Sequence, residues 1–218
     1  MAWFAEQRPL VFEQLRQGPG CLYDTSMKYL APVFLLAATQ LGAEAVNYDL
    51  APAPGNRLVL EVFKTGFLRG KKHTFHFERY RGTLSYDPAQ PTATRVRLGI
   101  EAGSLVLKDT WLSAKDFQKV QKYALEDMLA ATRYPELTFE SSAVQSSGTE
   151  QFEVQGRLTI RDVAKPVVIR VTRRAPLTFE GSATLQMTVW GLKPPSGGLG
   201  TVGTKDEMAF SFAILVRP

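Results

Sequence analysis

The segment that decides the fold is Phe152-Glu153-Val154-Gln155-Gly156-Arg157-Leu158-Thr159-Ile160. Its apolar residues fall at every second position, and Gly156 keeps the same phase. Side chains of a β-strand point alternately to its two faces, so this alternation predicts a strand with one apolar and one polar face.

The same alternation recurs along most of the chain. It is found in 58–63, 75–78, 95–101, 137–139, 167–171, 184–189 and 208–214. Turn signals such as Asp87-Pro88 and Ser147-Gly148 separate the segments. Together they predict about eight strands, and therefore an all-β domain.

One stretch has helical periodicity instead. From Asp116 to Thr132 the apolar residues lie on one helical face. Ser113 and Asp116 have the spacing of an N-terminal capping box, and Pro135 is expected to stop the helix.

Eight strands with one apolar face favour a closed barrel or a sandwich. The polar faces carry charged residues, which are Arg95, Arg97, Glu153, Arg157 and Arg161. Such a face is costly against lipid, so we expect a soluble barrel with an apolar interior. An eight-stranded lumen is either filled by side chains or holds one small ligand, and the alternation leaves both options open.

The N-terminal region has the layout of a secretory signal. Lys28 precedes the apolar run 29–41, and Ala43-Glu44-Ala45 matches an A-x-A cleavage pattern. We therefore expect translation to begin at Met27 and cleavage after Ala45. The expected domains are an extension with a signal peptide (1–45) and a barrel (46–218). The alternative is an ordinary buried helix over 28–41.

The composition restricts the chemistry. The 218 residues include one cysteine, Cys21, and two histidines, His73 and His76, with a net charge of +5. One cysteine excludes a disulfide framework or a Cys-rich metal site within the chain. The histidines are three apart in a predicted strand, so they should point to opposite faces, and we expect both at the surface or rim.

No segment suggests a catalytic site. Gly198–Gly203 matches G-x-G-x-x-G, but a strand rather than a helix is expected to follow it, so it does not indicate dinucleotide binding. The segment 191–205 is either a plain connection or a portal loop at the barrel mouth, with Leu192, Leu199 and Val202 as apolar contacts. We expect no enzyme activity, no cofactor and no metal.

A basic cluster lies in one predicted hairpin. It contains Arg69, Lys71, Lys72, Arg79 and Arg81, with Phe67, Phe75, Phe77 and Tyr80 between them. A mixture of basic and aromatic residues suits single-stranded nucleic acid, an anionic lipid surface or a solvated hairpin. For an exported chain we expect no nucleic-acid partner, and peripheral contact with an anionic membrane surface stays open.

Several segments resemble the YceI-like family. They are Gly82–Pro88 (GTLSYDP), Arg133–Ser141 (RYPELTFES), Gly156–Val167 (GRLTIRDVAKPV) and 191–207. Asp162 departs from the pattern, since a glycine is common there, and so does Thr65-Gly66, where many members carry a histidine. The similarity covers nearly all of residues 48–216.

The resemblance implies an extended, lipocalin-like, eight-stranded antiparallel β-barrel with one helix between strands. It also implies a periplasmic protein that binds a polyisoprenoid or isoprenoid-quinone chain in its lumen. The residues expected to line that lumen are Phe75, Phe77, Leu98, Ile100, Phe139, Leu158, Ile160, Met187, Phe210 and Phe212. The alternative is a ligand-free structural or interaction module of the cell envelope, for which a stress-related role is one possibility. The oligomeric state stays open, a dimer included.

Overall fold

The computed structural model describes residues 45–197 and 201–217. Segment 1–44, which carries the predicted start and most of the predicted signal peptide, lies outside the described residues. The strands are β1 (Val46–Leu50), β2 (Arg57–Gly66), β3 (Lys72–Phe77), β4 (Tyr80–Tyr86), β5 (Arg95–Glu101), β6 (Leu105–Leu107), β7 (Glu136–Gly148), β8 (Gln151–Ile160), β9 (Val163–Ala175), β10 (Thr178–Gln186), β11 (Ser196–Gly197) and β12 (Val202–Leu215).

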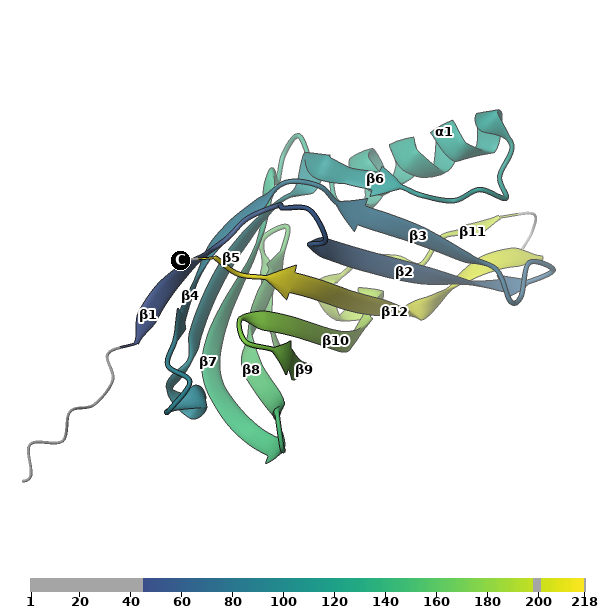
Figure 1. Cartoon of the computed structure of the whole chain (residues 1–218). Coiled ribbons are helices and arrows are strands. Elements are labelled where there is room, and N and C mark those ends of the chain that lie inside the picture. The colour runs from purple at the N-terminus through teal and green to yellow at the C-terminus, as the bar shows by residue number, and fades with distance from the viewer. Residues whose placement is uncertain (1–44, 198–200, 218) are drawn as a thin grey trace, which may run out of the picture. The chain divides into compact units, whose positions relative to one another are not determined.

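The strands form one antiparallel sheet that curls around its apolar face (Figure 1). Its order is β1-β4-β5-β7-β8-β9-β10-β12-β2-β3-β6, and β11 pairs with β12. Only Glu78 and Arg79 separate β3 from β4, so the two act as one bent strand and complete the circuit. The circuit has eight positions, namely β2, β3 with β4, β5, β7, β8, β9, β10 and β12. A bridge between Asp49 and Arg217 extends this closure to β1. The expected antiparallel barrel with one helix is thus confirmed, and its strand count is about eight when β3 and β4 are taken together and β1, β6 and β11 are left out.

The helix begins where the capping pattern predicts and ends earlier. Ser113 accepts a hydrogen bond from the Asp116 backbone N–H (3.2 Å) at the start of α1 (Ala114–Tyr123). A π-helical turn, η3 (Ala124–Met128), follows instead of a regular helix to residue 132. The Arg161 guanidinium donates to the Met128 carbonyl (3.0 Å). Satisfying a terminal carbonyl from outside stabilises this early end.

The predicted strand over 184–189 is also only partly correct. β10 ends at Gln186, and Met187–Trp190 forms a 3₁₀ turn, η4. The Asp206 carboxylate accepts hydrogen bonds from the Thr188 N–H (2.8 Å) and hydroxyl (2.7 Å). The turn buries Trp190, whose Nε1–H donates to the Leu158 carbonyl (3.2 Å). These contacts outweigh the local alternation and take the chain out of the sheet.

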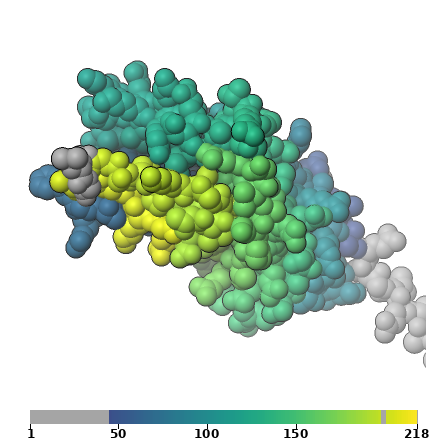
Figure 2. All heavy atoms as spheres, turned by 180° about the vertical axis from the view of Figure 1, so that it is seen from behind, coloured from purple at the N-terminus to yellow at the C-terminus, as the bar shows by residue number. Residues whose placement is uncertain are grey.

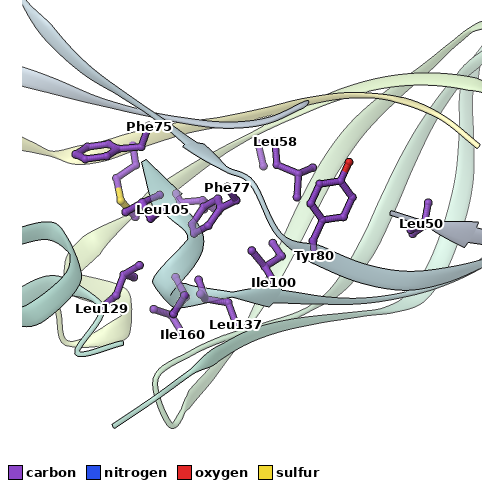
Figure 3. Packing of buried hydrophobic residues seen from close by; sticks show 14 of the residues in the cluster. Leu50, Leu58, Phe75, Phe77, Tyr80, Ile100, Leu105, Leu129, Leu137 and Ile160 are labelled. Atoms are coloured by element: carbon purple, nitrogen blue, oxygen red, sulfur yellow. The ribbon is translucent and has the colours of Figure 1, made fainter. Parts of the chain in front are cut away.

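The core lies inside the curled sheet. Figure 3 shows Ile100, Leu137 and Ile160 close together near Phe77, and Ile100 is the cross-strand partner of Leu137. Short 3₁₀ turns complete the loops, which are η1 (Pro91–Ala93) and η2 (Ala102–Ser104). No helix in the described part of the chain is long and apolar enough to cross a bilayer.

Candidate functional site: an apolar lumen

The barrel encloses a cavity with an almost wholly apolar lining. Its volume is about 180 Å³. An apolar cavity of roughly 150 Å³ already stays dry and binds benzene. Among the described residues, Thr94 and Tyr86 are the only lining residues with polar side chains, and none of the lining is charged. The site is therefore suited to an apolar guest.

Most of the predicted lumen residues surround this cavity. The lining includes Phe77, Leu98, Ile100, Phe139, Leu158, Ile160, Phe210 and Phe212. Phe75 and Met187 are buried but lie outside the lining. The alternation places Phe75 on the inner face, as predicted, but β6 pairs beside it (Phe75 with Leu107), and both residues belong to the buried core cluster.

Other lining residues escaped the sequence analysis. Val167, Ile169 and Val171 of β9 line the cavity with Phe179 of β10 and Leu192, which follows η4. The alternation along 167–171 predicted a strand face at these β9 positions but did not show that this face lines the cavity. Leu192 was proposed as a portal contact, and it is a buried wall residue. Val202 pairs with Gly66 instead, and Leu199 lies outside the described residues.

Two phenylalanine rings lie flat along the wall over glycines of the neighbouring strand. A Cβ atom at Gly156 would come within 2.5 Å of the Phe139 ring, and one at Gly181 within 2.5 Å of the Phe212 ring. Gly181 is also the cross-strand partner of Phe212. Because each ring occupies the space of a missing side chain, it does not fill the lumen. Phe210 and Phe212 remain partly exposed on the inner face.

A polar cluster spans one end of the lining. Arg173 of β9 donates to the Tyr86 hydroxyl on β4 and to Glu150 in the turn between β7 and β8 (Nη2–Oε1 2.6 Å). These hydrogen bonds lower the pKa of Glu150 and raise that of Arg173. Tyr86 also meets Phe179 of β10 edge-on, with ring centroids 5.4 Å apart. Three strands separate β4 from β9 in the sheet, so these contacts cross the end of the barrel.

The histidines differ from the expectation of two surface or rim residues. His73 is buried, and its Nδ1 lies 2.6 Å from Oδ2 of Asp109. The second carboxylate oxygen of Asp109 accepts the Thr74 N–H (2.9 Å), and Trp111 stacks on the His73 ring. The partner is 36 residues away along the chain and follows β6, so no local pattern reveals it. His76 lies on the opposite face, as the spacing predicts.

The titratable groups form no larger centre. Within residues 45–197 and 201–217, histidine, cysteine and acidic side chains nowhere gather in a group of three or more that could hold a metal ion. The His73–Asp109 pair is not part of the cavity lining. Its geometry supports a structural role that ties β3 to the segment after β6.

A family model for the YceI-like domain matches residues 56–215 of this chain. The chain belongs to the YceI-like family. The match covers β2 to β12, so every strand of the closed circuit lies within this YceI-like domain.

Similar proteins agree with this assignment. A UPF0312 protein of Pseudomonas savastanoi is 33% identical over 132 residues, which is 55% of this chain and 63% of that protein. A UPF0312 protein of Azotobacter vinelandii is 30% identical over 130 residues, which is 56% of this chain and 64% of that protein. The chain thus matches under two thirds of the length of these curated relatives.

Solved structures share the fold. Burkholderia cenocepacia BcnA aligns with a TM-score of 0.60 and 23% identity, over 76% of this chain and 98% of BcnA. A polyisoprenoid-binding domain from Saccharophagus degradans aligns with a TM-score of 0.52 and 12% identity, over 79% of this chain and 98% of that domain. At these identities the likeness supports the YceI-like barrel fold alone.

The ring-over-glycine packing gives a first prediction. Gly156→Ala places a methyl group against the Phe139 ring and 2.6 Å from the Glu140 carbonyl oxygen. Overpacking of this kind costs about 1–3 kcal/mol, to be measured by urea unfolding. Gly103→Ala is the matched control, because its nearest neighbour would be 3.9 Å away. Equal stability of the two variants would contradict the packing described.

The buried pair gives a second prediction. Asp109→Ala removes the partner of His73 and the acceptor of the Thr74 N–H, so we expect a loss of about 2–4 kcal/mol in unfolding free energy. Asp109→Asn keeps an acceptor oxygen and should recover part of that loss. Glu126→Ala, at an exposed ion pair with Lys122, should change stability by less than about 0.5 kcal/mol. If Asp109→Ala is as stable as Glu126→Ala, the structural role is wrong.

Proposed function

We propose that this protein is a periplasmic carrier that holds the isoprenoid chain of a polyprenyl lipid or quinone in its lumen. The observation that carries the proposal is an unfilled cavity, lined without charge, inside a barrel whose outer face is charged. Burial of an apolar chain contributes about 0.8 kcal/mol per CH₂ group, so length and apolar walls suffice for affinity. The Saccharophagus degradans neighbour, described as polyisoprenoid-binding, supports the same class of guest.

The lining also suggests how such a guest would lie. Tyr86 and Thr94, the polar lining residues, come from β4 and from the residue after η1. A buried polar group is stable only where it finds a hydrogen-bond partner. The head group would therefore lie at the end spanned by Tyr86 and Arg173, with the tail directed toward Leu129 and Leu192.

Native mass spectrometry followed by organic extraction tests the proposal. Residues 46–218, purified from a bacterial periplasm, should carry an excess mass that matches an isoprenoid lipid, and the extract distinguishes a polyprenyl lipid from a quinone. Phe212→Asp places a charge in the lumen and should abolish that mass. Val168→Asp, on the outward face of β9 where Val168 is 51% exposed, should retain it.

Leu98→Trp provides a second variant, because it fills the lumen without adding a charge. It should stay folded by circular dichroism and lose lipid. A wild-type protein that is free of lipid and takes up none from isoprenoid dispersions would overturn the carrier proposal. The ligand-free interaction module of the envelope would then be the better hypothesis.

Cell fractionation tests the location separately. The full chain with a C-terminal epitope, expressed in a Gram-negative host, should appear in the periplasm with its N-terminus at Val46. The A-x-A pattern at Ala43–Ala45 motivates this expectation. Recovery of the uncleaved chain from the cytosol would refute export and leave the lumen hypothesis standing.

A further inference from the structure

One end of the molecule carries an exposed aromatic residue within a basic surface. The turn between β2 and β3 projects beside β11 and the start of β12, as Figures 1 and 2 show from opposite sides. The Phe67 N–H donates to the Thr201 carbonyl (3.0 Å), and Gly203 pairs with both Thr65 and Ser196. We call this feature the basic tip and define it as residues 62–72, 191–197 and 201–205.

The tip presents a large apolar side chain to solvent. Phe67 is 90% exposed, far more than any other large hydrophobic residue in the described chain. Leu68 beside it is half-buried. A single exposed hydrophobic residue is ordinary on a protein surface, so its significance depends on what surrounds it.

The charged residues within the tip are all cationic. The tip contains Lys64, Arg69, Lys71, Lys72, Lys193 and Lys205, and no aspartate or glutamate. Lys72 pairs with Glu61 at the base, while Lys71 and Lys205 lie over the rings of Trp111 and Phe63. Arg69 and Lys193 are exposed. Arg79 and Arg81, which the sequence placed in the same cluster, instead pair with Glu101 and Glu136 away from the tip.

Aromatic rings with cations around them match a bilayer interface. Phenylalanine enters the boundary between head groups and acyl chains, while lysine and arginine stay with the phosphates. Each cation near an anionic leaflet strengthens the attraction to it. We propose that the basic tip docks this protein on an anionic lipid bilayer, with Phe67 inserted between the head groups. Docking by the tip does not depend on what the lumen holds.

Vesicle sedimentation tests the docking directly. Wild-type protein should bind phosphatidylcholine vesicles that contain phosphatidylglycerol and bind pure phosphatidylcholine vesicles far less. Its binding to the anionic vesicles should weaken as the salt concentration rises. Phe67→Ser should reduce partitioning roughly tenfold or more, because it removes the inserted ring. Arg69→Gln should reduce it about fivefold, because it removes one cation from the surface.

Two matched controls keep the test specific. Val168→Ser removes an exposed apolar side chain from the outer wall, and Arg157→Gln removes an exposed arginine from β8. Both should bind vesicles like the wild type. In addition, the indole emission introduced by Phe67→Trp should be quenched by brominated lipid in anionic vesicles.

Several outcomes would overturn the proposal. The proposal is wrong if the wild type does not bind anionic vesicles, or if the tip variants bind them as the wild type does. It is also wrong if brominated lipid leaves the added emission of the Phe67→Trp variant unchanged. Phe212→Asp should bind vesicles normally even if it loses its lumen lipid. Failure of the lumen hypothesis and failure of the docking are therefore distinguishable.

Discussion

The lumen depends on two contacts between aromatic rings and glycines. Eight strands enclose only enough space for their own side chains or one small guest, so the size of the inner-face residues decides between these states. Phe139 and Phe212 carry large inner-face side chains, but each ring lies against the wall at Gly156 and Gly181. The chain thus keeps a strongly apolar wall while leaving the space along it unfilled. The same rings would close the lumen if either glycine carried a side chain that pushed them inward.

The two ends of the barrel are built differently, which gives the lumen a direction. At one end Leu129 and Leu192 line the cavity, and the buried Trp190 ends η4. At the other end Arg173 reaches from β9 to Tyr86 on β4 across the opening. These cross-barrel contacts join strands that the sheet keeps apart. Among the described lining residues, polar side chains come from Tyr86 and Thr94 alone.

The sequence predicts those features that depend on local pattern and misses those that depend on distant partners. The alternation in 152–160 and 208–214 predicts β8 and β12, and the Ser113–Asp116 spacing predicts where α1 begins. The end of that helix depends on Arg161, and the departure from β10 depends on Asp206. The burial of His73 likewise needs Asp109. For the site, the alternation of apolar and polar residues identifies the side chains that face inward. It does not distinguish Phe77, which lines the cavity, from Phe75, which lies in the buried core.

The net positive charge is unevenly distributed between the wall and the basic tip. On the outer wall, cations face acids across strands: Arg97 lies 2.9 Å from Glu140, and Arg170 lies 3.7 Å from Glu153. Such exposed pairs add little stability, but they leave the wall nearly neutral. The tip itself contains no acidic residue, and of its cations Lys72 is paired, with Glu61 at its base. Since β2 contributes Leu58 and Leu60 to the lumen and then runs on to the turn at Phe67, one strand connects the lumen with the basic tip. The outer wall carries little net charge, whereas the tip is positively charged. This uneven distribution would orient the barrel at a negatively charged surface, with the tip toward that surface.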